Sequence, residues 1–335
     1  MWNLPTAARD GCVRKIWRLF DMKIVFLDAA TLGDVSFSPI MELGELVCWQ
    51  TSTPAEALER VSDCDVLIVN KVKVTRELID AAHALKLICE AATGVNNIDL
   101  EYAGARGIPV RNVAGYSTES VVQSTFMHIL SLVGQLPYYD WKVKTGRYSW
   151  SGLFTDVSRP FFELSGKTMG IVGMGTIGHR VAEVAGAFGM KVIYYSTSGT
   201  SHCTDYPSVP LDRLMAESDV VSVHAPLNGR TSGLIGKAEL ALMKPHAIIV
   251  NMGRGGIVDE AALAEAVDNG IIAGAGMDVY TEEPMNVKNP LSLAKHQERL
   301  SLTPHTAWAS VEARKRLVDM IAGNIAAFLS EGNRS

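Results

Sequence analysis

The stretch MGIVGMGTIG, residues 169–178, indicates the fold of this chain more clearly than any other part of the sequence. A short apolar run ends in the spacing Gly-x-Gly-x-x-Gly, and a helical pattern begins within the same motif. In this context the first glycine permits a tight turn, the second lets the backbone approach a pyrophosphate, and the third lets helix and strand pack closely. The helix N-terminus also offers free N–H groups to phosphates. We therefore expect a dinucleotide site rather than a glycine-rich turn without a ligand, and its residues are Gly173, Gly175, Thr176, Ile177 and Gly178.

Short apolar runs alternate with helical patterns on both sides of this motif, which is typical of βαβ units around a parallel sheet. Strands are predicted before it at 23–28, 65–69, 86–90 and 109–113, with helices that begin at Pro54, Thr75 and Asp99. A second series of strands is predicted at 169–173, 191–195, 219–225, 247–251, 273–279 and 299–304. A long helix after Thr118, reaching Pro137, could link the two series, and a final helix over 309–329 could return to the first. The sequence thus predicts an α/β protein with two domains.

The composition narrows the class of protein. The chain has 335 residues, 47% of them apolar and 20% charged, so a large core can form, and a net charge of −5 gives no basic face for nucleic acid. No apolar run reaches the roughly 18–20 residues that a membrane helix needs.

The five cysteines are scattered, which argues against disulfides and a zinc site and favours a reducing compartment such as the cytoplasm. Residues 1–21 lack the alternating pattern of the rest of the chain and are expected to be an extension outside the fold, with a targeting peptide as the alternative.

Three side chains suited to carbonyl chemistry each follow a predicted strand of the second series. Because ligands of parallel sheets bind beyond the carboxyl ends of the strands, we expect Arg254, Glu283 and His305 to share one site. An arginine can hold a planar carboxylate and polarise the neighbouring carbonyl, and a histidine can give that oxygen a proton as hydride arrives from a nicotinamide. A glutamate on the far ring nitrogen would fix the tautomer, and its replacement by glutamine is expected to shift the pH–rate profile. Each residue alone would more simply be a cap or a surface group.

The predicted strand at 191–195 is followed by Ser196 and two more hydroxyl residues, where an acid would favour NAD by binding the ribose 2′-hydroxyl. Neither an acid nor an arginine for a 2′-phosphate occurs in this segment, and His202 is the nearest polar side chain. The hydroxyl groups could therefore accept either NAD or NADP, and the lack of a basic cluster favours NAD. His224 ends another predicted strand, where it could line the cofactor cleft or simply pack in the core.

The segment YYDWKVKTGRYSW, residues 138–150, is rich in tyrosine and tryptophan for a predicted loop. Interfaces between subunits enrich these residues, so the segment could form a subunit contact. Local packing beneath the loop explains it equally well, and the sequence leaves both open.

Five blocks of the chain, in order, resemble those of the D-isomer-specific 2-hydroxyacid dehydrogenases, and the resemblance runs from about Met22 to the end. The blocks are the glycine motif at 173–178, HAPLN at 224–228, NMGRGGIVDEAAL at 251–263, GAGMDVYTEEP at 274–284 and LTPHTAWAS at 302–310. The resemblance implies two doubly wound, Rossmann-like domains. A cofactor domain of residues 119–305 would be inserted into a flavodoxin-like substrate domain of residues 22–118 and 306–335, with a cleft between them.

The same resemblance implies functions for single residues. The catalytic set would be Arg254, Glu283 and His305, and the cofactor site would further include Ser196, His224, Pro226, Met252, Gly253 and Asp278. Asp278 would hold the nicotinamide amide. The loop at 92–99 would bind the substrate carboxylate through backbone N–H groups, those of Gly94 and Val95 among them. Lys71 would add positive charge there, unless it is a plain surface lysine.

Within the family the chain is most similar to glycerate dehydrogenases, also called hydroxypyruvate reductases, in the blocks NKV at 70–72, GYSTESV at 115–121 and HTAWAS at 305–310. The resemblance implies reduction of hydroxypyruvate or glyoxylate with NADH, with NADPH as the alternative, by a cytoplasmic homodimer without a metal. D-lactate dehydrogenase is the neighbouring alternative. A corepressor-like protein that senses dinucleotides is the alternative from another class, and an assay of keto-acid reduction would separate it from an enzyme.

Overall fold

The computed structural model describes residues 22–332. The chain divides into two compact units. The first unit holds the residues up to Ser117 together with those from Ala309 onward, and the second unit holds Thr118–Trp308. The extension expected at residues 1–21 lies outside the described residues. Among the residues that are described, no helix has both the length and the apolar character to span a membrane.

A five-stranded parallel sheet with the order β2-β1-β3-β4-β5 forms the first unit. Its strands are β1 (Lys23–Phe26), β2 (Glu45–Cys48), β3 (Val66–Val69), β4 (Leu87–Glu90) and β5 (Val110–Arg111). Its helices are η1 (Ala29–Leu32), α2 (Ser38–Met41), α3 (Pro54–Arg60), α4 (Arg76–Ala81), α5 (Leu100–Ala105) and α13 (Val311–Gly332). Both β3 and β4 are buried along their whole length, as is typical of parallel strands covered on two faces.

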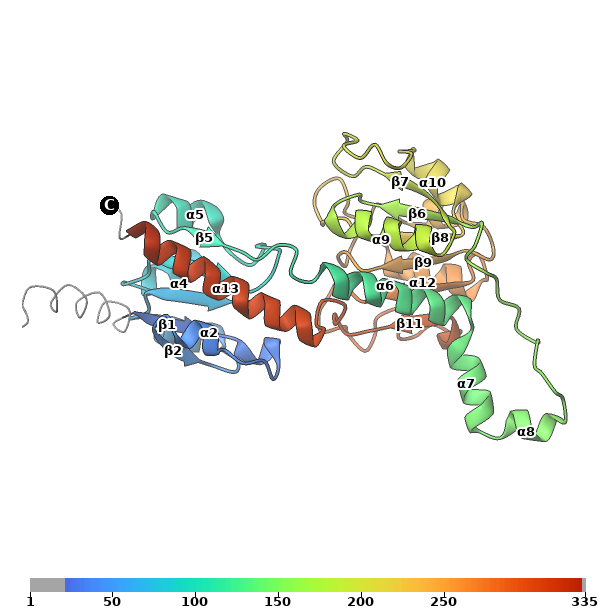
Figure 1. Cartoon of the computed structure of the whole chain (residues 1–335), viewed down its shortest axis with the longest axis horizontal. Coiled ribbons are helices and arrows are strands. Elements are labelled where there is room, and N and C mark those ends of the chain that lie inside the picture. The colour runs from blue at the N-terminus through green and yellow to red at the C-terminus, as the bar shows by residue number, and fades with distance from the viewer. Residues whose placement is uncertain (1–21, 333–335) are drawn as a thin grey trace, which may run out of the picture. The chain divides into compact units, whose positions relative to one another are not determined.

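Two features of the first unit go beyond the sequence-based expectation. The strand β2 was not predicted, because it lies at the edge of the sheet and none of its four residues is buried, so it lacks a clear apolar run. The helix α13 packs on α2 and β4, so the last helix of the chain completes the first sheet although it follows the second unit in the sequence (Figure 1).

A six-stranded parallel sheet with the order β11-β10-β9-β8-β6-β7 forms the second unit. Its strands are β6 (Thr168–Val172), β7 (Lys191–Tyr195), β8 (Val220–Val223), β9 (Ile248–Asn251), β10 (Gly274–Met277) and β11 (Leu300–Leu302). Its helices are α6 (Thr118–Val133), α7 (Leu136–Lys144), α8 (Arg147–Ser151), α9 (Thr176–Ala187), α10 (Leu211–Glu217), α11 (Lys237–Ala241), α12 (Glu260–Asp268) and η2 (Gln297–Arg299). The strand order reverses between β6 and β8, and ligands of such sheets bind at that point, beyond the carboxyl ends of the strands.

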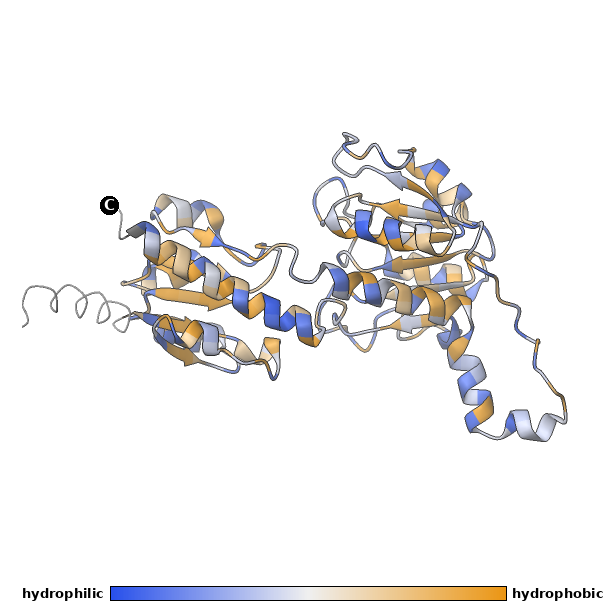
Figure 2. Cartoon of the chain, in the orientation of Figure 1, coloured by the Kyte–Doolittle hydropathy of each residue, from blue (hydrophilic) through white to orange (hydrophobic). Residues whose placement is uncertain are grey.

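Apolar clusters cover the two faces of this second sheet. One cluster joins the strands to α6 and α9 and includes Ile129 and Val181. The other joins them to α10, α11 and α12 and includes Leu214 and Leu263. Most of the central strands of both units are coloured as hydrophobic in Figure 2. Helices on both faces of parallel sheets confirm the predicted fold class, two doubly wound α/β domains.

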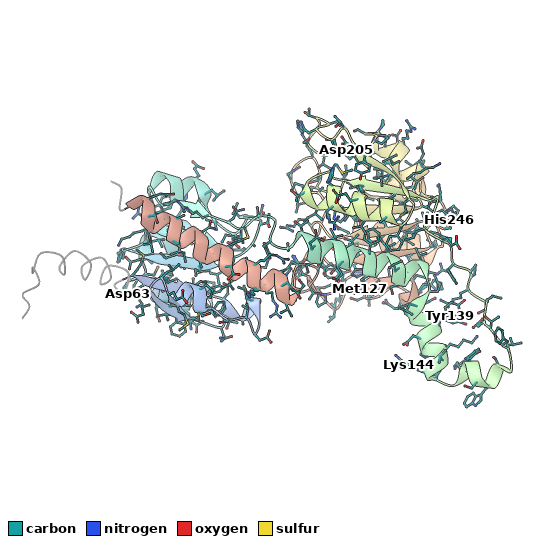
Figure 3. All side chains as sticks on the ribbon, in the orientation of Figure 1. Asp63, Met127, Tyr139, Lys144, Asp205 and His246 are labelled. Carbon is teal, nitrogen blue, oxygen red and sulfur yellow. The ribbon has the colours of Figure 1, made fainter. Side chains whose placement is uncertain are left out.

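The aromatic segment 138–150 is helical, and the prediction of a loop there was wrong. The long helix expected to reach Pro137 ends at Val133, and α7 starts after Gln135, which has the left-handed φ of 52°. No residue of α7 or α8 is buried. Figure 1 shows these two helices extending from the body of the second unit, and Figure 3 labels Tyr139 and Lys144 on α7. Tyr139 and Tyr148 donate to carbonyl oxygens of the segment that follows α8, at 2.7 Å each, while Trp150 is 85% exposed.

Candidate active site

The loop between β6 and α9 carries the glycine motif, and its geometry fits a bound phosphate group. Gly173 has a φ of 96°, and a Cβ atom there would come within 3.0 Å of Ala225. A Cβ atom at Gly178 would lie 2.2 Å from the carbonyl oxygen of Gly173, so no side chain fits. At Gly175, by contrast, a Cβ atom would meet nothing within 4 Å. The middle of the motif is therefore open to a ligand, beside the first N–H groups of α9.

A pocket of about 290 Å³ opens in front of this motif. It is lined by Gly173, Gly175, Ser196, His224 and Pro226, all of them predicted from the sequence. These residues follow three different strands, β6, β7 and β8, which meet at the point where the strand order reverses. Thr197, Ser198 and His202, which the sequence analysis placed after the predicted strand, line the same pocket. Sequence reasoning missed the other residues that line it, namely Met174, Tyr194, Thr200, Cys203 and Asn228.

The side chains of Thr176 and Ile177, the two remaining residues of the motif, differ in whether a bound ligand can reach them. Thr176 is exposed and lines a neighbouring pocket of about 380 Å³. The side chain of Ile177 packs against the apolar cluster below α9. Ile177 can therefore contribute its backbone N–H group to a phosphate site, but not its side chain.

An arginine lies where the sequence analysis expected none. Ser196 and Ser198 both donate through their hydroxyl groups to the carbonyl oxygen of Thr200, at 2.7 and 2.9 Å, which closes a small turn after β7. The guanidinium of Arg230 donates to the carbonyl oxygen of Ser198. The segment after β7 itself holds no arginine, as the sequence analysis states, and Arg230 comes from the loop after β8, 32 residues beyond Ser198 in the chain.

His224 contributes a neutral ring to this pocket. Its Nε2 lies 2.7 Å from Oγ of Ser222, and its Nδ1 is buried with no hydrogen-bond partner among the described residues. Burial lowers the pKa of His224 to about 3. The ring is therefore uncharged at neutral pH and adds no positive charge to a phosphate site.

His305 and Glu283 meet beyond the ends of the neighbouring strands β11 and β10. Nδ1 of His305 lies 2.6 Å from Oε2 of Glu283, and Oε1 of Glu283 accepts the N–H group of Tyr280 at 3.0 Å. The side chain of His305 is 25% exposed, so its Nε2 is the ring nitrogen available to a ligand. His305 also has a φ of 55°, a left-handed conformation that a residue other than glycine keeps only when its surroundings impose it.

Asp278 holds the loop that carries His305. Its buried carboxylate accepts the hydroxyl group of Thr303 at 2.6 Å and the N–H groups of Thr306 and Ala307 at 2.8 and 2.9 Å. Both carboxylate oxygens are thus bound to this loop. The resemblance implied a contact with the nicotinamide amide, whereas the contacts of Asp278 in the structure fix the backbone on both sides of the histidine.

Arg254 lies on a turn that Asn251 fixes from the end of β9. The amide of Asn251 donates to the carbonyl oxygen of Arg254 at 2.9 Å, and its oxygen accepts the N–H group of Gly253 at 3.0 Å. A Cβ atom at Gly253 would lie 2.8 Å from the carbonyl oxygen of Ala225. The guanidinium of Arg254 is partly buried and donates to the carbonyl oxygen of Gly253 at 2.8 Å. The side chain of Met252 packs in the apolar cluster below α6 and α9.

The three predicted catalytic residues follow strands that end at the same edge of the sheet. β9, β10 and β11 are neighbours, so Arg254, Glu283 and His305 follow the carboxyl ends of three adjacent parallel strands. A Cβ atom at Gly255 would lie 1.9 Å from the carbonyl oxygen of Tyr280, so the turn after β9 lies directly against the loop after β10. The structure places Glu283 and His305 in contact and Arg254 on the adjacent turn.

Of the predicted substrate-binding residues, Lys71, Gly94 and Val95 belong to the first unit, and Arg254 and His305 to the second. Lys71 follows β3, its side chain is exposed, and its N–H group donates to Asp28 at 2.6 Å. Gly94 and Val95 are partly exposed in the loop after β4. The hydroxyl group of Thr93 anchors that loop by donating to the carbonyl oxygen of Val113 at 3.0 Å. The loop is therefore held in a defined conformation with two backbone N–H groups near its tip.

One group of potential metal ligands occurs among the described residues, although the sequence analysis expected no metal. His179, Cys203 and Asp205 place ligand atoms within 4.8 Å of one another, and Asp205 is labelled in Figure 3. The imidazole of His179 lies 3.1 Å from Asp205 and 3.3 Å from Glu183. These contacts are explained by ion pairing on the surface of the second unit, and we assign no metal to them.

Comparison with known proteins identifies the family. Residues 126–307 match the model of the D-isomer specific 2-hydroxyacid dehydrogenase, NAD binding domain. The chain is 35% identical over 315 residues to a hydroxypyruvate reductase of Blautia hydrogenotrophica, covering 92% of this chain and 97% of that protein.

Solved structures that are similar to this chain carry bound dinucleotides, as two examples show. An NADPH-dependent glyoxylate/hydroxypyruvate reductase of Sinorhizobium meliloti, in complex with NADP and malonate, is 29% identical with a TM-score of 0.79, over 92% of this chain and 94% of that one. A D-lactate dehydrogenase of Aquifex aeolicus, complexed with NAD and lactic acid, is 28% identical with a TM-score of 0.80, over 92% and 96%. With the resemblance thus confirmed, this chain belongs to the family of D-isomer specific 2-hydroxyacid dehydrogenases and is an oxidoreductase that uses NAD(P).

Proposed function

We propose that this enzyme reduces hydroxypyruvate to D-glycerate and glyoxylate to glycolate. The observation that carries the proposal is the 2.6 Å contact between Nδ1 of His305 and Glu283, because it leaves Nε2 to give a proton to the substrate carbonyl. A nicotinamide dinucleotide bound at the glycine motif supplies the hydride. Glu283 fixes the tautomer of His305 and stabilises the positive ring that the enzyme needs before proton transfer.

Arg254 has the complementary role in this proposal. Its guanidinium binds the carboxylate of the keto acid and polarises the neighbouring carbonyl oxygen, which accumulates negative charge as hydride arrives. We infer that the first unit contributes the N–H groups of Gly94 and Val95 and the charge of Lys71 to substrate binding. The second unit, Thr118–Trp308, supplies the dinucleotide site.

Steady-state kinetics with a panel of 2-keto acids tests this function. We expect hydroxypyruvate to give the highest kcat/KM, with turnover in the ordinary enzyme range of about 1–1000 per second. A higher kcat/KM for pyruvate would identify a D-lactate dehydrogenase instead. Tight dinucleotide binding without turnover of any keto acid would favour a dinucleotide-sensing protein.

We further propose NADP(H) as the preferred cofactor, in place of the NAD(H) that the sequence favoured. The turn after β7 has no acid to repel a 2′-phosphate. The hydroxyl groups of Ser196 and Ser198 donate to the carbonyl oxygen of Thr200 and would turn from it to donate to a bound phosphate. Arg230 adds the positive charge that the sequence analysis did not find. An arginine beside hydroxyl donors is the usual chemistry of a 2′-phosphate site.

Replacing Arg230 by alanine is therefore expected to raise the Kd of NADPH by about 10- to 100-fold, the range for losing a hydrogen bond to a charged group. The Kd of NADH should change less than about twofold, because NADH has no 2′-phosphate. Fluorescence titration of the reduced cofactors measures both constants without turnover. Arg213→Ala, on the exposed face of α10, is the matched control. An unchanged Kd for NADPH, or tighter binding of NADH by the unmodified enzyme, would contradict the assignment.

We propose a cytoplasmic homodimer that forms through α7, α8 and the segment after them. The side chains of Trp150, Phe154 and Val157 are 85%, 95% and 80% exposed. Large apolar side chains exposed within one short segment favour an interaction site, and symmetric homodimers are the commonest soluble oligomers. Free cysteines at Cys64 and Cys89 accord with a reducing compartment.

The double substitution Trp150→Asp with Phe154→Asp is expected to convert the dimer into a monomer of 36.2 kDa, because two carboxylates would have to be desolvated in the interface. Light scattering after size-exclusion chromatography measures the mass. Leu293→Asp changes another exposed apolar residue, outside α7, α8 and the segment after them, and should leave the mass unchanged. A monomeric unmodified enzyme would refute the proposed dimer.

A further inference from the structure

Glu90 is a buried carboxyl group with only half of its hydrogen-bonding capacity used. It is the last residue of β4, in the interior of the first sheet, and its side chain is completely buried. Its Oε2 accepts the amide of Asn97 at 2.9 Å, whereas its Oε1 has no partner among the described residues. A buried carboxylate is costly when it is not paired and fully hydrogen-bonded, so this environment favours the uncharged acid.

The charged groups around Glu90 do not offset the free-energy cost of burying its ionised form. Asp28, after β1, adds negative charge, and Lys71, after β3, adds positive charge. Arg111, on the neighbouring β5, is bound to the carbonyl oxygen of Asn324 at 2.9 Å and to Glu331 at 2.6 Å, both on α13. Burial, with Asp28 as a smaller contribution, raises the pKa of Glu90 to about 8, against the opposing hydrogen bond from Asn97. Glu90 is therefore mainly protonated at neutral pH and ionises in mildly alkaline solution.

Asn97 connects Glu90 to both loops that the proposed function assigns to the substrate. The amide nitrogen of Asn97 donates to Glu90 and also to the carbonyl oxygen of Val72 at 3.1 Å. The carbonyl oxygen of Asn97 accepts the N–H group of Val74 at 2.8 Å. Asn97 thus ties the loop of Gly94 to the loop of Lys71.

Asp28 also holds the loop of Lys71. Its carboxylate accepts the N–H groups of Asn70, Lys71 and Val72 at 3.0, 2.6 and 2.9 Å. The two acidic residues therefore act on one loop, Asp28 directly and Glu90 through Asn97. The side chain of Asn97 is held in one orientation because its amide nitrogen donates to both Glu90 and Val72.

We propose that Glu90, as an uncharged acid, is a positioning residue that keeps the two substrate loops in register and keeps a second negative charge away from the carboxylate of the keto acid. The proposal rests on the proposed function, since it assumes that an anionic substrate binds at these loops. When Glu90 loses its proton, its negative charge opposes binding of the anion, while the hydrogen bond from Asn97 is kept. Substrate affinity then falls, while proton transfer by His305 continues.

The test is the pH dependence of KM for hydroxypyruvate in the unmodified enzyme and in Glu90→Gln, which removes the charge and keeps an oxygen for Asn97. At pH 6.5 the two KM values should agree within about twofold. By pH 9 the KM of the unmodified enzyme should exceed that of the variant by about 3- to 10-fold, the effect of one nearby charge at a partly screened site. The two proteins differ only at residue 90, so the ratio of the KM values isolates Glu90. Glu77→Gln, on the exposed face of α4, is the matched control.

Two further measurements keep the outcomes distinct. Asn97→Ala should raise KM at every pH while kcat changes less than about threefold, because the link between the loops is lost but the proton donor is not. The same pH series with oxamate, an unreactive analogue of a keto acid, gives an affinity that does not depend on turnover. Parallel KM curves for the unmodified enzyme and Glu90→Gln from pH 6 to 9.5 would overturn the proposal. Absence of any turnover of hydroxypyruvate at pH 6.5 would instead contradict the proposed function, and the oxamate series would still decide the role of Glu90.

Discussion

Replacing His305 by glutamine is expected to lower kcat by about 100- to 10,000-fold, the usual cost of losing a general acid. Glutamine keeps a polar side chain of similar length, but it cannot release a proton to the carbonyl oxygen of the substrate. The Glu283 carboxylate, 2.6 Å from Nδ1 in the unmodified enzyme, would be left to accept an amide hydrogen. The measurement is steady-state reduction of hydroxypyruvate under saturating NADPH.

Binding of the cofactor separates this chemical effect from damage to the fold. The Kd of NADPH should remain within about threefold of its original value, because the glycine motif lies after β6 and His305 after β11. His83→Gln changes an exposed histidine of the first unit and should leave kcat unchanged. Activity of His305→Gln close to that of the unmodified enzyme would remove the histidine from the mechanism.

Arg254→Ala is expected to lower kcat/KM for hydroxypyruvate by about 100- to 1000-fold, since truncating one partner of a desolvated charge pair costs about 2–5 kcal/mol. The loss should appear in both KM and kcat, because the guanidinium binds the carboxylate and also stabilises charge that develops on the carbonyl oxygen. NADPH affinity should stay nearly unchanged.

Arg254→Lys refines this second prediction. A lysine keeps the charge but cannot form two parallel hydrogen bonds to a carboxylate, so it should recover only part of the lost kcat/KM. Full recovery by lysine would mean that charge alone is needed at this position. A loss confined to cofactor affinity would show that Arg254 serves the dinucleotide instead.

The sequence was most informative where a local pattern corresponds to one physical requirement. The glycine spacing at 173–178 could be interpreted because each glycine meets a separate steric demand, and the structure shows those demands at Gly173 and Gly178. The contact between Glu283 and His305 could be anticipated because both follow strands of a parallel sheet. The carboxyl ends of adjacent parallel strands lie at one edge of the sheet, so residues far apart in the sequence come close together there.

The sequence was least informative where function depends on contacts between distant loops. Arg230 contacts the turn of Ser198 from another loop, and no spacing rule connects the two positions. The partners of Asp278 in the His305 loop were likewise hidden. Glu90 gave no signal, because a glutamate that ends an apolar run resembles a residue at a solvated strand end.

The position of α13 has a consequence for how the chain is made. Arg111 and Glu331 are joined at 2.6 Å across 220 residues, and the helix that completes the first sheet follows the whole second unit. At a synthesis rate of about 5–20 residues per second, the second unit can fold on the ribosome while the first still lacks its last helix. The first unit should therefore mature late, and a nascent chain interrupted near residue 308 would expose the apolar face that chaperones recognise.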